Sequence, residues 1–489
     1  GVRHEGAAAF AAGAYGKLTG RPAACLTIAG PGATNLLTGL MDARVDRAPV
    51  VAFTGQVATQ YLGPGNFQEC NLEDAFSAFT AFSKTVLHPK SANELMALAL
   101  KYAITKSDVG HLILPDEVQI LPEVEGAAVA PREGRLPDFD IEPAPDALKA
   151  ATEALREAKR PVIILGYGAK RAAADVVRLA EHLDAPMVTT FKAKGLVSDD
   201  HPLACGVLGR SGTPVGSWFM NECDLLLVLG ASFSKHTGIT DKKGTIQVDV
   251  DPMQLGKFHP VDIPLWAEIG RAVGRFTKAV PSSGDRGSAG EVAARWKIWR
   301  KEKAKRARDD RGLGLPAAFI FKALSERAPA DAVIAVDVGN NTYSFGRYFE
   351  AKGQSVLMSG YMGAIGFGLP AGIGAACGAP GRKVLVVCGD GGFGQYLADF
   401  TTAVKYELDV TVVLLNNGQL GKISKEQRAG EYAVWQTSLV NPGFAEFAKL
   451  CGAMGVRVED RASLGPVLQQ AIAHEGTALV EIMQDGQLI

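Results

Sequence analysis

The chain has 489 residues, which is too long for one ordinary hydrophobic core, so two to four domains are expected. Its 51 basic and 52 acidic side chains leave a formal net charge of −1, which argues against nucleic acid or an anionic membrane as a partner. No apolar run reaches membrane-spanning length, and the seven cysteines are dispersed without a CxxC pair, which indicates reduced thiols and a cytoplasmic protein.

The first stretch of the chain opens with a helical pattern, residues 1–20, rather than with a strand. We therefore expect the first domain to lack its N-terminal segment. Apolar runs that end in turns follow at 23–30, 49–55 and 110–116, with helical patterns between them. This alternation is typical of parallel strands covered by helices. It assigns residues 1–121 to a first α/β domain.

Two further stretches repeat this alternation. The segment 122–146 is rich in proline, glutamate and alanine and is interpreted as a linker to a middle domain at 147–280. A basic helix at 296–311, expected to lie solvated on the surface, precedes a third domain at 312–489. The fold class is therefore α/β, with three doubly wound parallel-sheet domains. The strands expected in the second and third domains lie at 160–168, 185–191, 224–233, 245–252, 332–339, 383–390, 409–417 and 478–485.

Polar residues end two neighbouring strands of the third domain. The turn GDGG at 389–392 ends one strand, and two asparagines end the next. Because ligands bind beyond the carboxyl ends of parallel strands, we expect Asp390 and Asn417 to lie together. A carboxylate, an amide oxygen and a carbonyl suit Mg²⁺, and glycines at a helix start let phosphate approach the backbone. A GDG turn alone is also an ordinary strand ending, but its spacing from the asparagine pair favours a metal and diphosphate site.

This spacing resembles the signature of thiamine diphosphate enzymes. With DVGNN at 337–341 and YMGAIGFGLPAGIGA at 361–375, the chain is similar to the group of acetolactate synthase, pyruvate oxidase and quinone-reducing pyruvate dehydrogenase. The resemblance covers essentially the whole chain, in the order pyrimidine-binding, middle and diphosphate-binding domains. It implies that Mg²⁺ is bound by Asp390, Asn417 and the carbonyl of Gln419. The implied diphosphate contacts are Gly339, Asn340, Gly391 and Gly392.

The other end of the coenzyme is implied by the start of the chain. RHEGAAAFAAGAYG resembles the family segment whose glutamate protonates N1′ of the coenzyme pyrimidine, which makes Glu5 the candidate. Burial would make its protonated form accessible, whereas the alternative is an ordinary glutamate stabilised by the helix dipole. The resemblance also places the Gly363 carbonyl on the 4′-amino group and Ile365 under the bend of the coenzyme.

The residues after the asparagine pair bear on the reaction. KISKEQRAGEY lacks the tryptophan-containing stretch usual in acetolactate synthases, and its KEQ is similar to pyruvate oxidases, which implies that Glu426 faces the substrate. An exposed helix acid is the alternative. Phe67 and Gln68 are implied to face the thiazolium. The resemblance thus implies decarboxylation of a short 2-keto acid, foremost pyruvate, with the enamine oxidised by FAD. An acetolactate synthase-like carboligase, a non-oxidative lyase or decarboxylase and a non-enzymatic paralogue are the alternatives.

The middle domain bears on the flavin. Its segments 206–213, 230–238 and 246–252 occupy positions that hold FAD in relatives, although VDIPLWAE at 261–268 departs from the family pattern. Some relatives keep this domain with ADP or with no ligand. The candidate FAD contacts are Gly209, Thr213 and Asp249.

The resemblance also bears on the oligomeric state. In relatives the glutamate and the metal site serve one coenzyme from two chains, which implies a homodimer or homotetramer without membrane or nucleic-acid partners.

Overall fold

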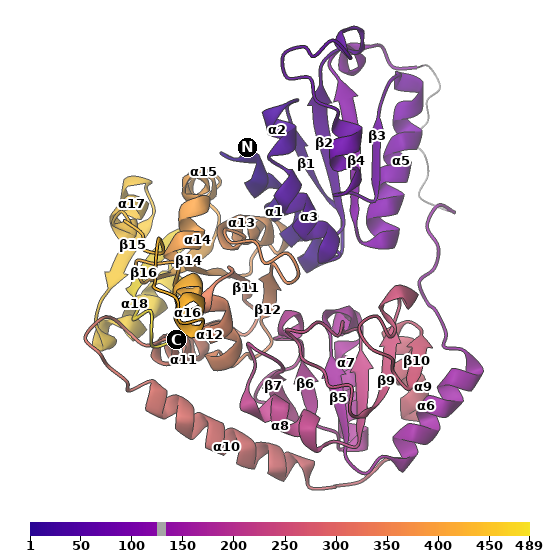
Figure 1. Cartoon of the computed structure of the whole chain (residues 1–489), viewed down its shortest axis with the longest axis vertical. Coiled ribbons are helices and arrows are strands. Elements are labelled where there is room, and N and C mark those ends of the chain that lie inside the picture. The colour runs from indigo at the N-terminus through magenta and orange to yellow at the C-terminus, as the bar shows by residue number, and fades with distance from the viewer. Residues whose placement is uncertain (125–133) are drawn as a thin grey trace.

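The computed structural model describes residues 1–124 and 134–489. Three α/β units are visible in Figure 1, running from indigo through magenta to yellow, and each is built round a parallel sheet. The linker predicted at 122–146 falls partly outside the described residues, and its described part contains neither helix nor strand before residue 145. No helix in the described ranges combines the length and apolar character that crossing a membrane requires.

The first unit has a four-stranded sheet in which every pairing is parallel. Its helices and strands are α1 (Glu5–Thr19), β1 (Ala23–Thr27), α2 (Pro31–Thr34), α3 (Leu37–Val45), β2 (Val50–Gln56), α4 (Leu72–Ser77), β3 (Phe82–Thr85), α5 (Pro89–Lys106) and β4 (Val109–Pro115). The strand order is β1-β2-β4-β3. The central strands β2 and β4 are buried almost throughout, which accounts for their mostly apolar sequence.

The middle unit has a six-stranded parallel sheet. Its helices and strands are α6 (Pro145–Glu157), β5 (Pro161–Leu165), α7 (Ala173–Leu183), β6 (Met187–Thr189), β7 (Ala204–Val207), α8 (Pro214–Glu222), β8 (Leu225–Leu229), β9 (Gly244–Asp249), β10 (Ile263–Trp266) and α9 (Ile269–Ala279). The strand order is β10-β9-β8-β5-β6-β7. It reverses between β5 and β8, so a ligand crevice is expected beyond the carboxyl ends of these two strands.

The third unit has a six-stranded parallel sheet in the order β12-β11-β13-β14-β16-β15, with helices on both faces. Along β11, Val333 and Ala335 pack with α13 on one face, while Ile334 and Val336 pack with α11 and α18 on the other. The elements are α11 (Ala317–Arg327), β11 (Val333–Val336), α12 (Asn340–Tyr348), β12 (Ser355–Met358), α13 (Gly368–Gly378), β13 (Val384–Gly389), α14 (Asp390–Gln395), α15 (Phe400–Lys405), β14 (Val410–Asn416), α16 (Gly421–Ala429), α17 (Phe444–Leu450), β15 (Met454–Val458), α18 (Arg461–Ala473) and β16 (Ala478–Met483).

The predicted fold class is confirmed, and every strand predicted from the sequence overlaps a strand of the structure. The structure adds β3, β7, β10, β12 and β15, and each of these lies at the edge of its sheet. An edge strand pairs on one side only and is incompletely covered, so its sequence need not be a continuous apolar run. The sequence pattern therefore revealed the sheet centres and missed most of their edges.

The helix that joins the middle and third units differs from its prediction. It is α10 (Ser288–Arg306), which starts eight residues earlier than predicted and runs along the lower side of the molecule in Figure 1. One of its faces is buried, so the solvated helix predicted at 296–311 is wrong in this respect. The Trp296 indole donates to the Ala204 carbonyl at 2.7 Å, and Lys303 Nζ donates to the Tyr348 carbonyl at 2.8 Å. The helix therefore bonds to both units that it connects.

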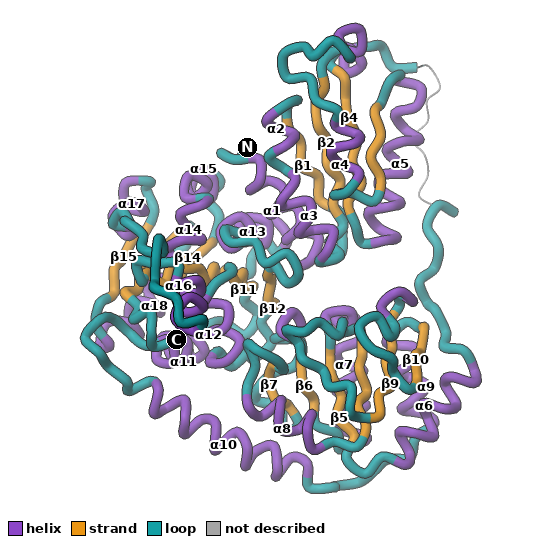
Figure 2. The backbone as a smooth tube through the Cα atoms, in the orientation of Figure 1, coloured by secondary structure: helices purple, strands orange, loops and turns teal. Residues whose placement is uncertain are grey.

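The first and third units meet through α1 and α13, which lie side by side in Figures 1 and 2. Gly374 of α13 permits this close approach, because a Cβ at that position would collide with the backbone of Ala11 in α1. Phe10 of α1 joins the hydrophobic core beneath the third sheet. Helix α1, which carries the predicted catalytic glutamate, is therefore fixed to the unit that carries the predicted metal site.

Candidate active site

The strands β13 and β14 are parallel neighbours, and this pairing brings the two predicted metal-binding segments together. Asp390 is the first residue of α14 and is 3% exposed. Its Oδ2 accepts hydrogen bonds from the Gly418 amide at 2.9 Å and from the Asn441 side chain at 2.7 Å. Burial raises the pKa of Asp390, while these bonds oppose the shift. The protein thus holds this carboxylate in one orientation.

The turn after β14 supplies the remaining predicted ligands. Gly418 has φ +66°, a left-handed conformation that suits glycine and reverses the chain here. The side-chain oxygen of Asn417 accepts from the Gln419 amide at 3.1 Å, and the Gln419 carbonyl accepts from Gly421 at 2.9 Å. The site therefore offers one carboxylate, one amide oxygen and one carbonyl, all hard oxygen donors suited to Mg²⁺.

The start of α12 faces this turn. The side-chain amide nitrogen of Asn340 is buried and has no hydrogen-bond partner among the described residues. A Cβ on Gly421 would lie 2.7 Å from that nitrogen and 3.4 Å from the side-chain nitrogen of Asn417. An orphaned buried donor beside the predicted metal ligands fits a bound anion, because an unpaired buried donor is otherwise costly.

Glycines line the same cradle. Gly339 precedes α12 with φ +151°, and a Cβ on Gly392 would collide with the Asp337 carboxylate. A Cβ on Gly391 would lie 2.9 Å from Leu420. Only a residue without a side chain fits at Gly392 unless Asp337 moves. The residues present therefore fit a magnesium diphosphate group, which Asp390, Asn417 and Asn340 would hold.

Asp337 is a residue of this site that the sequence did not single out. Its Oδ1 accepts from the Val338 amide at 2.6 Å and from the Gly366 amide at 2.9 Å. Its Oδ2 faces Gly392 and has no hydrogen-bond partner in the described ranges. Burial raises the pKa of Asp337 to about 7. One buried carboxyl thus joins three loops of the site; the only sequence signal was its place in DVGNN, at the end of a predicted strand.

The loop between β12 and α13 carries the residues expected to shape the coenzyme. Gly363 has φ +65°, and apart from its chain neighbours no described residue has an atom within 4 Å of the position of its missing Cβ. Ile365 is apolar yet 37% exposed, and its neighbours Tyr361 and Met362 are exposed as well. This loop therefore presents apolar surface rather than burying it, which is compatible with a ligand that covers it.

Glu5 is the first residue of α1. Its carboxylate accepts from the Asn35 side chain at 3.0 Å, which lowers the pKa of Glu5. The burial expected from the sequence is not provided by this chain alone, in which Glu5 is half-buried. The adjacent backbone amides of Arg3 and His4 donate to the Asp399 carboxylate of the third unit at 2.7 and 3.3 Å. The first turn of α1 is thus anchored close to α14 and α15 while the Glu5 carboxylate points to Asn35.

Phe67 and Gln68 lie in the loop between β2 and α4. Phe67 is 87% exposed, so its predicted contact with the thiazolium stays a prediction. Gln68 has φ +62° and packs against Gly30, where a Cβ would lie 3.0 Å from its own Cβ. A Cβ on Gly32 would lie 3.6 Å from the Glu5 carboxylate. The turn at residues 30–32 therefore separates Gln68 from Glu5.

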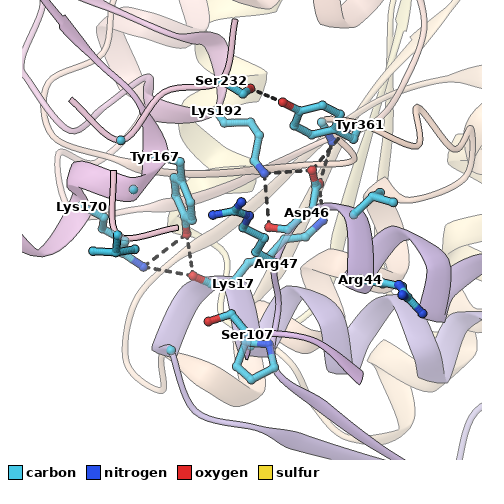
Figure 3. A pocket seen from close by; sticks show the side chains of 18 of the residues that line it. Lys17, Arg44, Asp46, Arg47, Ser107, Tyr167, Lys170, Lys192, Ser232 and Tyr361 are labelled. Atoms are coloured by element: carbon cyan, nitrogen blue, oxygen red, sulfur yellow. Dashed lines mark hydrogen bonds and ion pairs between the residues drawn. The ribbon is translucent and has the colours of Figure 1, made fainter. Parts of the chain in front are cut away.

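A cavity of about 1930 Å³ opens between the three units. Asp249 of the middle unit lines it together with Gly339 and Gly363 of the third unit. Among the described residues of its wall, ten are lysine or arginine and three are acidic, so the cavity is strongly cationic although the chain is almost neutral. Figure 3 shows Arg47 pointing into this space. A large anionic ligand is the complementary occupant.

The predicted flavin contacts differ in their relation to this cavity. Asp249 is in its wall, 3.9 Å from Arg47, which also donates to Asp251 at 2.5 Å. The Thr213 hydroxyl caps α8: it donates to the Cys205 carbonyl at 2.8 Å and accepts from Gly216 at 3.1 Å. Thr213 thus uses its hydroxyl within the protein.

Gly209 and Glu426 are the remaining predicted site residues. Gly209 has φ +92°, and a Cβ there would collide with the backbone of His236, so this position needs glycine. Glu426 lies on α16, where it pairs with Lys422 one turn earlier. This bond lowers the pKa of the exposed Glu426 carboxyl. The structure thus presents Glu426 as a surface helix acid, and its contact with substrate stays a prediction.

The three-sheet architecture and the glycine-lined cradle define a coenzyme-dependent enzyme of the thiamine diphosphate class. Three domain descriptions of thiamine pyrophosphate enzymes, the same coenzyme under its other name, match the chain in order. They are the N-terminal TPP binding domain at 1–77, the central domain at 148–276 and the C-terminal TPP binding domain at 337–482.

Relatives match almost the whole chain. It is 36% identical to the thiamine pyrophosphate-containing protein YdaP of Bacillus subtilis, over 99% of this chain and 84% of YdaP. It is 31% identical to the acetolactate synthase large subunit of Corynebacterium glutamicum, over 96% and 78% of the two chains. It is 30% identical to the large subunit of acetolactate synthase isozyme 1 of Escherichia coli, over 99% and 87%. The chain therefore belongs to the thiamine pyrophosphate enzyme family.

Proposed function

We propose that the protein decarboxylates a short 2-keto acid, foremost pyruvate, with thiamine diphosphate and Mg²⁺, and that FAD takes up the two electrons released. The family membership supports the coenzyme. The observation that carries the oxidative reaction is the cationic cavity, which extends from Asp249 on the middle unit to Gly339 and Gly363. A dinucleotide held on the middle unit would thus reach the loops that hold the coenzyme.

When bound, thiamine diphosphate supplies a nucleophilic thiazolium carbon and an electron sink for decarboxylation. Asp390, Asn417 and the Gln419 carbonyl would hold the metal, and the orphaned amide of Asn340 would donate to the diphosphate. Glu5 would hold a proton at N1′ of the pyrimidine. Ile365 offers exposed apolar surface against which the coenzyme would bend.

A partner subunit is part of this proposal. Glu5 is only half-buried within one chain, whereas a carboxyl that shares its proton with the coenzyme needs desolvation. A second copy that covers Glu5 would raise its pKa. We therefore propose a homodimer at minimum, or a homotetramer, and light scattering of the purified protein with and without the magnesium coenzyme measures its mass.

A carboligase that joins two 2-keto acids is the second candidate. The acetolactate synthases of Corynebacterium glutamicum and Escherichia coli among the relatives favour it. The stretch after the asparagine pair favours the oxidative reaction instead, because KISKEQRAGEY contains no tryptophan.

Product analysis separates these reactions. The purified protein is given pyruvate, Mg²⁺ and thiamine diphosphate, with and without a redox dye, and the Asp390→Ala variant serves as control. We expect acetate and dye reduction in proportion to CO₂, and a bound chromophore absorbing at about 450 nm, as flavins do. Acetolactate without dye reduction would establish the carboligase, acetaldehyde would establish a non-oxidative decarboxylase, and no CO₂ from any short 2-keto acid would refute the proposal.

A further inference from the structure

A buried group of charges lies where α1 and α3 cross. Asp42 lies on α3 and Asp46, four residues later, caps the C-terminus of that helix, so both carboxylates lie on one side of it and contact Lys17 of α1. Gly13 of α1 permits the close approach of the two helices, because a Cβ at that position would lie only 3.3 Å from Ala43. Lys17 Nζ donates to Asp42 at 2.7 Å and to Asp46 at 2.8 Å.

This group joins all three units of the fold. Lys17 Nζ also donates to the Met358 carbonyl of the third unit at 2.9 Å. From the middle unit, Lys192 Nζ donates to Asp46 Oδ1 at 2.8 Å. Figure 3 shows Asp46 between Lys192 and Lys17 at the wall of the large cavity. Lys17 and Asp46 together thus contact side chains or backbone of every unit.

The same carboxylates hold the loop that follows Met358. The Gly360 amide donates to Asp46 Oδ2 at 2.7 Å, and the Tyr361 amide donates to Asp46 Oδ1 at 3.2 Å. The Ser359 hydroxyl donates to Asp42 at 2.5 Å. The loop's path from 359 to 361 is therefore set by side chains of the first unit.

A hydrogen bond within the loop after Met358 extends this control to Ala364. The Ala364 amide donates to the Ser359 hydroxyl at 2.9 Å, so a residue held by Asp42 fixes the segment immediately after Gly363. The next residue is Ile365. The two groups proposed to shape the coenzyme, the Gly363 carbonyl and the Ile365 side chain, are thus positioned from Asp42 and Asp46.

Asp46 keeps its charge although it is buried. Burial favours the neutral acid, but attraction to Lys17 and Lys192 outweighs it and lowers the pKa of Asp46. Burial raises the pKa of Asp42, whose one cationic partner among the described residues is Lys17. An ion pair in such a place gives little net stability, because desolvation offsets the attraction. What Asp46 provides beyond stability is a pair of acceptors for two consecutive loop amides.

We propose that Asp46 is a positioning residue for the coenzyme: it sets the loop 359–366 from the first unit and thereby fixes the surface against which thiamine bends. The inference rests on the proposed function. It predicts different effects on the two ends of the coenzyme. The loop would contact the thiamine end, while Asp390 and its neighbours would hold the diphosphate end.

The test compares two ligands in the isosteric variant Asp46→Asn. Calorimetry measures the dissociation constants of thiamine diphosphate and of inorganic pyrophosphate, each with Mg²⁺. Losing charge-assisted bonds to the loop should weaken thiamine diphosphate about tenfold, while magnesium pyrophosphate binds as in the wild type. The near-ultraviolet circular dichroism of the bound coenzyme should change in the same variant.

Asp199→Asn is the matched control. Asp199 is also buried, pairs with Lys194 at 3.1 Å and accepts from the Ala351 amide at 2.7 Å, but it does not bond to the loop 359–366. It should alter neither constant. Ser359→Ala removes no charge and opens the link from Asp42 to Ala364, so it should weaken thiamine diphosphate selectively even if Asp46→Asn does not fold.

The outcomes separate this inference from the function on which it rests. A wild-type protein that binds neither ligand refutes the proposed function. If the wild type binds both, and Asp46→Asn and Ser359→Ala bind thiamine diphosphate equally well, the positioning role alone is refuted. Equal loss of both ligands in these variants, or the same selective loss in Asp199→Asn, would also overturn it, since that pattern reflects general destabilisation.

Discussion

Asn441 donates its side-chain amide to Oδ2 of Asp390 at 2.7 Å, although 51 residues separate the two in the sequence. The same amide donates to Asn416 at 3.1 Å, and Asn416 in turn donates to the buried Glu481 at 2.8 Å. The carboxylate at the end of β13 is thus oriented by a chain of amides that ends on β16. Such supporting contacts fix a metal ligand before the metal binds.

Asp390→Ala should abolish the binding of Mg²⁺ and diphosphate together. The variant removes the only carboxylate among the proposed ligands, and the diphosphate is held largely through the metal. Saturating magnesium coenzyme should stabilise the wild type by about 3 kcal/mol at a hundredfold excess over its dissociation constant. A melting temperature of Asp390→Ala that still rises with added coenzyme would contradict the assignment.

Asn441→Ala should weaken Mg²⁺ binding by roughly 10- to 100-fold without removing a ligand, because Asp390 loses its orienting donor. Calorimetric titration of Mg²⁺ in the presence of thiamine diphosphate measures the effect. Asn66→Ala is the control, since Asn66 bonds to the Tyr61 carbonyl in the loop after β2. Equal affinities in the wild type and both variants would show that the Asn441 contact is incidental.

Glu5→Gln should retain coenzyme affinity but lower turnover by about 10² to 10⁴-fold. The amide oxygen of glutamine can still accept from Asn35, so the local structure should persist, but it cannot exchange a proton with N1′. Steady-state rates and calorimetric affinities are compared in the same preparation. A turnover number equal to that of the wild type rules out the proposed role of Glu5.

Asp337→Asn should flatten the pH dependence of stability. In the folded protein the pKa of Asp337 is raised from 3.8 to about 7, so between these values the native state binds more protons than the unfolded chain. Stability from this group is present at low pH and is lost as pH rises towards 7. Between pH 5 and pH 8 the wild type should lose about 2 to 3 kcal/mol more than the variant.

Urea denaturation at pH 5 and pH 8 measures that difference. The Asp199→Asn protein provides a comparison in which another buried carboxyl is replaced. If the wild type and Asp337→Asn lose the same free energy of unfolding between the two pH values, Asp337 does not titrate as its burial implies.

The sequence alone predicted the three α/β units because central parallel strands are buried on both faces and must be apolar along their length, as β11, β13 and β14 are. The same reasoning placed Asp390 and Asn417 together at the carboxyl ends of their strands, since parallel neighbours end on the same side of the sheet. Local sequence likewise predicted the glycine before α12 and the two glycines in the first turn of α14. These are properties of short segments and of the strand period.

Only the tertiary structure decided which distant residues support that site. Asn441 and Asp46 reach the loops of this site from positions whose local sequence carries no sign of it, and Asp337 was marked only by its place in DVGNN, because a side chain's partners depend on how the helices and sheets pack. The buried face of α10 and most of the edge strands escaped prediction for the same reason: their environment is made by neighbouring elements. The half-exposed setting of Glu5 is likewise a property of the folded chain, and the proposed partner subunit would change it.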